Sequence, residues 1–194
     1  PQKELMTETL AAAVAAIRAG GIVAYPTAGV WGLGCDPANE DAVRRLPSLK
    51  QRSIEKGLIL LAADEAQLAP WIAPLNPALA KRLRATWPGP VTWIVPCRND
   101  CPGWLTGNRD TLAVRVTAHP PARALCAAAG MALTSTSANP SGNMPLTTST
   151  AVREAFGPAL AAVLDGPLGE LNGPTEIRDA LTGHILRPAP KRRT

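Results

Sequence analysis

The sequence has few aromatic residues, and this scarcity bears on what the protein binds. Of its 194 residues, five are Trp, one is Tyr and one is Phe. Domains that bind single-stranded RNA on a sheet face stack the bases on Phe and Tyr side chains. The composition therefore argues against a stacking platform of that kind.

Histidine and cysteine are also scarce. The chain has two His and four Cys, and only one pair of Cys is close in sequence, as C-x3-C. Two histidines exclude a His-rich zinc or iron site, and C-x3-C without a second pair is weak evidence for a metal. We predict no metal-ligand set and interpret the thiols as structural: Cys35, Cys97, Cys101 and Cys126.

Long hydrophobic runs are absent as well. No stretch approaches eighteen uncharged apolar residues, and the sequence opens Pro-Gln-Lys-Glu, so we expect neither a membrane span nor a signal peptide. With 46% hydrophobic and 18% charged residues, the chain is typical of a globular protein. We predict a cytoplasmic protein with one domain over residues 1–188, a basic tail over 189–194, and no membrane partner.

The net charge is +5, but Lys191, Arg192 and Arg193 supply three of these charges from a tail that looks frayed. The remaining body is weakly basic. Non-specific nucleic-acid binding depends on many Lys and Arg contacts, so this body is poor evidence for it. An exposed acidic partner for the tail remains open.

Helical and strand patterns alternate along the chain. A helix carrying Leu10, Val14 and Ile17 ends at Gly20-Gly21, and the short apolar run Ile22–Tyr25 follows as a buried strand. Further helices are expected near 39–49 (kinked or ended by Pro47), 64–67, 76–84, 121–129 and 150–156, and strands near 58–62, 91–95, 111–116, 131–134, 160–164, 176–180 and 184–187. No helix is expected between 91–95 and 111–116, so part of the sheet is antiparallel. The pattern predicts a single-domain α/β fold with a twisted sheet of parallel and antiparallel strands and flanking helices.

Standard nucleotide and hydrolase motifs are missing. The sequence has no G-x-x-x-x-G-K-[ST], no dinucleotide glycine spacing and no G-x-S-x-G. Three glycines in Ala28–Gly34 mark a backbone that needs unusual torsions or a close approach to another group.

A basic segment, residues 50–56, follows the second helix. In an extended chain Lys50, Arg52 and Lys56 share one face, which suits a phosphate ligand. The alternative is a solvated basic loop.

Two further polar features lie near strands. Ser135, Ser137 and Asn139 alternate just after an apolar strand, so in an extended run they face one way. They bind either a ligand's oxygens or their own turn backbone. Arg115 interrupts an apolar strand and needs a partner, which is either a structural carboxylate or a ligand's carboxylate or phosphate.

These segments occur together in an order that resembles the YrdC/TsaC family. The match runs from the first helix to Leu186-Arg187-Pro188 and includes the family's K-x-R at 50–52 and S-x-N at 137–139. The chain is similar to the short bacterial form, which lacks the extra C-terminal domain of longer relatives. Other segments that carry the resemblance are Ala24–Thr27, Val30–Gly34, Lys56–Leu60, Trp87–Thr92, Leu112–Val116 and Glu176–Ala180.

The resemblance implies a YrdC-like fold with a central basic cavity. It also implies a nucleotidyltransferase reaction in which L-threonine, bicarbonate and ATP, with Mg²⁺, give threonylcarbamoyladenylate and pyrophosphate. The product would serve threonylcarbamoyladenosine modification of tRNA next to the anticodon. Implied partners are the threonylcarbamoyl-transferase proteins TsaB, TsaD and TsaE, and tRNA or double-stranded RNA.

The resemblance implies site residues position by position. The signature tetrad assigned to catalysis is Lys50, Arg52, Ser137 and Asn139. The ATP side would comprise Lys50, Arg52, Lys56, Thr111, Ser135, Asn139 and Arg187. The threonine side would comprise Thr27, Arg115 and Ser137.

The chain departs from the family pattern at a few positions. Ala28 and Gly29 replace an acidic and a hydroxyl residue, Ser53 stands where Pro is usual, and Ala189 replaces Gly. The first two bear on amino-acid selectivity. Alternatives to the synthase are a non-catalytic structured-RNA-binding or ribosome maturation factor and a carbamoyl-transfer domain of hydrogenase maturation. The sequence lacks the acylphosphatase and C-x2-C segments that accompany the latter.

Overall fold

The structure is a computed structural model that describes residues 2–50, 58–140 and 142–193. Arg52, Ser53 and Lys56, on which the basic-segment prediction depends, lie outside the described residues. In the described part of the chain one mixed sheet has the order β7-β1-β2-β6-β3-β5-β4-β8-β9. Its strands are β1 (Val23–Pro26), β2 (Trp31–Gly34), β3 (Ile59–Ala62), β4 (Val91–Pro96), β5 (Thr111–Val116), β6 (Leu133–Ser137), β7 (Ala162–Val163), β8 (Glu176–Asp179) and β9 (Ile185–Arg187).

Parallel and antiparallel pairs alternate irregularly across this sheet. β1 with β7, β3 with β5, and β4 with β8 are parallel, and the other neighbouring pairs are antiparallel. β6 is the seam, because it pairs with β2 on one side and with β3 on the other. The predicted α/β fold with a mixed sheet is confirmed.

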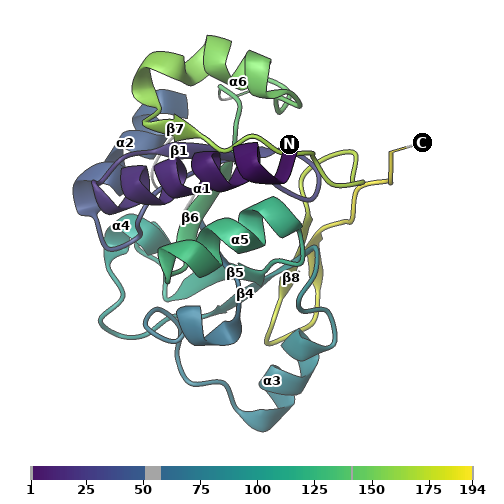
Figure 1. Cartoon of the computed structure of the whole chain (residues 1–194). Helices are drawn as coiled ribbons and strands as arrows, with labels where there is room; N and C mark the ends of the chain where they lie inside the picture. Colours follow the sequence, from purple (N-terminus) through teal and green to yellow (C-terminus); the bar gives the residue numbers. More distant parts are fainter. Residues whose placement is uncertain (1, 51–57, 141, 194) are drawn as a thin grey trace.

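Helices cover both faces of the sheet. α1 (Gln2–Arg18) and α5 (Pro120–Ala129) lie side by side over one face (Figure 1). Their small and apolar residues bury Val23, Tyr25, Leu61 and Leu133 from β1, β3 and β6. The opposite face packs in a larger cluster with residues from α2 (Glu40–Lys50), α3 (Pro77–Arg84), α4 (Gly103–Thr106) and α6 (Ser149–Phe156).

Helix starts follow the expected capping chemistry. The side chains of Asn39 and Asn76 accept hydrogen bonds from the backbone N–H of Ala42 (3.0 Å) and Leu79 (2.9 Å). Asp64 caps the short 3₁₀ helix η2 (Glu65–Gln67) in the same way, and a second 3₁₀ turn, η3 (Gly157–Ala159), follows α6. Among the described residues, no helix is long and apolar enough to cross a membrane.

One expectation about elements was wrong, and two others are met with a difference of detail. The helix expected over 39–49 is α2, which does not end at Pro47 but continues to Lys50, one residue past the expected boundary. Pro47 removes one backbone donor, but the helix is held by its buried residues Val43 and Leu46. The one-turn helix α4 lies between β4 and β5, where none was expected. The glycine-rich stretch includes β2, and of its two predicted explanations the close approach applies, because Gly32 and Gly34 face closely packed groups within an extended strand.

The tail was also expected to be frayed, and it is docked. The backbone N–H of Asn172 donates to the carbonyl oxygen of Lys191 (2.8 Å), and the N–H of Arg193 donates to that of Glu170 (2.6 Å). Residues 191–193 thus pair with residues 170–172 over one bridge.

Candidate functional site

A cavity of about 310 Å³ lies over the part of the sheet face that α1 and α5 leave open. Its size is at the lower end of the range for small-molecule sites. β3, β5 and β6 contribute Ile59, Ala113 and Ser135, which are neighbours in register across the three strands. The next pair on the same face of β3 and β6, Leu61 and Leu133, packs in the cluster formed with α1 and α5. The cavity is therefore the uncovered continuation of a core face.

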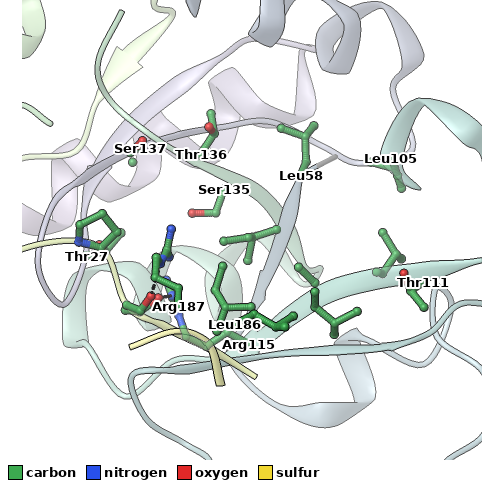
Figure 2. Close-up of a pocket in the computed structure, with 18 of the residues that line it drawn as sticks. Thr27, Leu58, Leu105, Thr111, Arg115, Ser135, Thr136, Ser137, Leu186 and Arg187 are labelled. Atoms are coloured by element: carbon green, nitrogen blue, oxygen red, sulfur yellow. Dashed lines mark hydrogen bonds between the residues drawn. The ribbon is translucent and has the colours of Figure 1, made fainter. Parts of the chain in front are cut away.

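Alternation along the strands explains which residues reach the cavity. On β5, Leu112, Val114 and Val116 point into the large cluster, so Thr111, Ala113 and Arg115 point the other way. The remaining described lining residues come from loops, from α4, and from β2, β4, β8 and β9. Figure 2 shows Ser135 directed toward the middle of the pocket, Arg115 and Arg187 close together, and Leu58, Leu105 and Thr111 toward the other end.

Arg115 is the most unusual residue of the site. Its side chain is buried, with 4% exposure, and it donates to the hydroxyl oxygens of Thr92 (3.1 Å) and Thr175. No described carboxylate forms an ion pair with it. Burial lowers the pKa of Arg115 to about 10, so the guanidinium is charged at neutral pH. The sequence left two possible partners for Arg115, a structural carboxylate or a ligand. Among the described residues, no carboxylate takes the first role.

Thr175 links Arg115 to a second cation. Its hydroxyl accepts from Arg115, and its carbonyl oxygen accepts from Nε of Arg187 (2.8 Å). The positive charge of Arg187 adds to the lowering of the Arg115 pKa. Because Arg115 and Arg187 are both bonded to Thr175, their positive charges lie close together, and this arrangement favours an anionic ligand.

A polar network stands at the end of β6. Nζ of Lys50 donates to Oγ1 of Thr136 (2.8 Å), to the carbonyl oxygen of Ser137 (2.6 Å) and to Oγ of Ser137 (3.2 Å). Oγ of Ser137 donates to Oδ1 of Asn139 (2.6 Å). Nδ2 of Asn139 in turn donates to the carbonyl oxygens of Pro140 and Asn143. Three members of the signature tetrad are thus hydrogen-bonded in series.

The structure corrects the expectation of an extended basic segment at Lys50, the one residue of that segment that it describes. Lys50 is the last residue of α2, so it is helical, and it is 3% exposed. Its ammonium group donates hydrogen bonds to Ser137, which lines the cavity. It therefore orients Ser137 and brings a positive charge to the end of β6.

The structure brings most of the expected site residues together. Those that line the cavity are Thr27, Thr111, Arg115, Ser135, Ser137 and Arg187. Lys50 and Asn139 join through the network at β6, and Arg52 and Lys56 lie outside the described residues. Sequence reasoning missed Thr136, Thr175 and Arg109, which also line the cavity. The alternation of Thr136 with Ser135 and Ser137 hid it, whereas Thr175 and Arg109 lie in loops without a periodic signal.

The loop between β1 and β2 closes one side of the cavity. The Thr27 hydroxyl donates to the carbonyl oxygen of Val30 (2.6 Å), and both residues line the cavity. A Cβ on Gly29 would lie 2.0 Å from the carbonyl oxygen of Gly173. The prediction of a close approach at these glycines is confirmed for Gly29, and the approaching group is this chain's own backbone.

The charged side chains among the described lining residues are all arginines: Arg109, Arg115 and Arg187. No described Asp or Glu lines the cavity. In the described part of the chain, no group of three or more His, Cys, Asp or Glu is placed to hold a metal ion.

The sequence also matches known proteins over most of its length. The Sua5/YciO/YrdC family model, described as "Telomere recombination", matches residues 15–189. The threonylcarbamoyl-AMP synthase of Halorhodospira halophila is 55% identical over 175 residues, which are 90% of this chain and 92% of that protein.

Solved structures match as well. E. coli YciO has a TM-score of 0.80 and 27% identity, over 97% of this chain and 91% of that one. P. abyssi Sua5 in complex with L-threonine has a TM-score of 0.84 and 31% identity, over 91% of this chain. The match spans about half of the Sua5 chain (53%). The profile match and the 55% identical relative cover most of the sequence, and the chain belongs to the Sua5/YciO/YrdC family.

Proposed function

We propose that the protein is an L-threonylcarbamoyladenylate synthase, which converts L-threonine, bicarbonate and ATP to threonylcarbamoyladenylate and pyrophosphate. The relative at 55% identity is named as a threonylcarbamoyl-AMP synthase. The observation that carries the proposal is Arg115, a buried cation in the cavity whose described partners are two hydroxyls. An amino-acid carboxylate is a ligand that would complete this arrangement.

The reaction has two steps. The amine of threonine and bicarbonate form a carbamate with loss of water. A carboxylate oxygen of the carbamate then attacks the α-phosphorus of ATP, the bond to the bridging oxygen breaks, and pyrophosphate leaves. Neither step needs a covalent enzyme nucleophile, so positioning and charge stabilisation are the tasks of the protein.

The described residues divide these tasks by position. Arg115 binds the threonine carboxylate, and Thr27 and Ser137, which also line the cavity, fix its orientation. Ser135, Thr111 and Arg187 lie along the strands as contacts for the nucleotide. Lys50 holds Ser137 in place through two hydrogen bonds, and Asn139 accepts from the Ser137 hydroxyl. We propose Arg52 and Lys56 as further phosphate contacts on the basis of the family signature alone.

Mg²⁺ would enter as part of the ATP substrate. The described lining offers no carboxylate, so phosphate oxygens and water would supply most of its ligands, as is common for this ion. The three lining arginines and Lys50 give the cavity the basic character that a triphosphate requires.

The central test follows pyrophosphate release by the purified protein with ATP, Mg²⁺, bicarbonate and L-threonine. We expect release that depends on both L-threonine and bicarbonate, and a product with the mass of threonylcarbamoyladenylate. Release that proceeds equally without L-threonine would count against the proposal.

The cellular role is a further part of this proposal. A mixed anhydride of a carbamate and a phosphate is reactive, so an acyl-transfer step must consume it. TsaB, TsaD and TsaE, with tRNA as the final acceptor, fit this step and follow from the family resemblance. The alternative of a non-catalytic RNA-binding factor is less favoured, because the 55% identical relative is named as a synthase.

A further inference from the structure

The docked segment 191–193 ends in a side chain that joins two other parts of the chain. Nε of Arg193 donates to the carbonyl oxygen of Leu171 (3.1 Å), and Nη2 donates to that of Gly29 (2.8 Å). Gly29 is in the β1–β2 loop, and Leu171 is in the strap, defined here as residues 169–175. One guanidinium therefore clamps the loop to the strap.

Three successive carbonyl oxygens of the β1–β2 loop accept hydrogen bonds from the strap and from Arg193. The carbonyl oxygen of Thr27 accepts from the N–H of Gly169 (3.0 Å), and that of Ala28 accepts from the N–H of Leu171 (3.0 Å). The carbonyl oxygen of Gly29 is the third in the row, and its partner is Arg193. The absence of a side chain at position 29 permits this contact, since a Cβ there would collide with Gly173.

The inner sides of both clamped segments form the cavity wall. Thr27 and Val30 line the cavity from the loop, and Pro174 and Thr175 line it from the strap. Thr175 is also the residue that bonds to Arg115. A change in the distance between loop and strap would therefore move Thr27 relative to Arg115.

We propose that Arg193 is a positioning residue that sets the threonine side of the cavity by clamping the β1–β2 loop to the strap. This role rests on the proposed function, because it concerns the binding of L-threonine. It gives one of the three tail charges an internal partner, in place of the acidic partner that the sequence left open.

The test compares Arg193→Ala with Arg192→Ala in the full chain. Arg192 is its neighbour and has the same charge, but the only described partner of its side chain is Glu170, in an exposed ion pair at 3.4 Å. We expect Arg193→Ala to raise the KM for L-threonine about tenfold, as the loss of about one charge-assisted hydrogen bond would. The KM for ATP should change less than about twofold, and Arg192→Ala should behave like the wild type.

The KM of Arg193→Lys for L-threonine should lie between those of the wild type and Arg193→Ala, because an ammonium group lacks the planar fork that reaches both carbonyls. Equal KM values for L-threonine in Arg193→Ala and Arg192→Ala would overturn the proposal. So would equal increases in the KM values for L-threonine and ATP, which would indicate a general structural role.

A second measurement separates this inference from the proposed function. Hydrogen exchange of the Gly169 and Leu171 amides reports on the clamp without any turnover. We expect faster exchange in Arg193→Ala than in Arg192→Ala, even if the protein catalysed a different reaction. Unchanged exchange would show that the clamp does not exist in solution, whereas missing threonine-dependent turnover in the wild type would refute the function alone.

Discussion

Arg115 illustrates how a single residue can be placed for a ligand at a cost to the fold. Burying a cation with neutral hydroxyls as its described partners disfavours the charged form, which is why its pKa is lowered to about 10. The folded protein therefore binds this proton less tightly than the unfolded chain does. The resulting cost is fully present at every pH below about 10 and is lost progressively as the pH rises from this folded-state value toward the higher pKa of the unfolded chain.

We therefore expect Arg115→Met to lose function without losing stability. Removal of the buried charge relieves the desolvation cost, and Thr92 and Thr175 remain as hydrogen-bond partners of each other at 3.3 Å. Pyrophosphate release dependent on L-threonine should fall about 100-fold or more. Urea unfolding at pH 7.5 checks the stability, and a large drop there would mean that Arg115 is a structural residue.

At the scale of elements, the contact between β2 and β6 leaves no room for a side chain at Gly34. A Cβ on Gly34 would lie 2.0 Å from the carbonyl oxygen of Thr134 and 2.9 Å from the Tyr25 hydroxyl. The Tyr25 hydroxyl donates to the same carbonyl oxygen (2.9 Å), and burial raises the pKa of Tyr25, which keeps it neutral. The side chain of Tyr25 thus occupies the space that the glycine leaves.

Gly34→Ala should destabilise the protein by about 3 kcal/mol, because backbone at the seam has to move. Gly157→Ala is the control, since a Cβ at Gly157 meets nothing within 4 Å and its φ is −43°. That variant should stay within about 0.5 kcal/mol of the wild type. Similar unfolding midpoints for the two variants in urea would contradict the close packing at the seam.

The same elements show what the sequence could and could not predict. The apolar runs predicted β5 at its observed bounds, with Arg115 as a cation inside it. β6 begins and ends later than the expected 131–134, so Ser135 and Ser137 belong to the strand itself, because its polar end is buried as well. The prediction that Lys50 lies in an extended segment was wrong. The buried residues of α2 extend the helix past Pro47 to Lys50, so the Lys50 side chain projects from a helix end. Thr175 and the contacts of Arg193 could not be predicted, because they depend on loops that meet only in three dimensions.

At the scale of the whole molecule, the proposed ligands should stabilise the fold as a unit. The cavity is lined from the seam strand β6, from β2 on one side of it, and from β3, β5, β4, β8 and β9 on the other. L-Threonine at about one hundred times its Kd should add about 2.7 kcal/mol, or roughly 5–10 °C in Tm for a protein of this size. Differential scanning calorimetry measures this shift.

Arg115→Met provides the matched control for that measurement. The shift with L-threonine should vanish in this variant, whereas the shift with ATP and Mg²⁺ should remain. Loss of both shifts would indicate that the whole cavity had collapsed, and would contradict a separate threonine contact at Arg115.

The place of β6 in the sheet also has a consequence for biosynthesis. β6 joins β2 to β3, yet it is made long after both of them: Ser137 pairs with Gly32, and Ser135 pairs with Ile59. A nascent chain that has left the ribosome only as far as α5 therefore presents two unpaired strand edges, the kind of surface that recruits chaperones or aggregates. The strand that carries Ser135 and Ser137 into the cavity is thus also the one whose arrival closes the sheet.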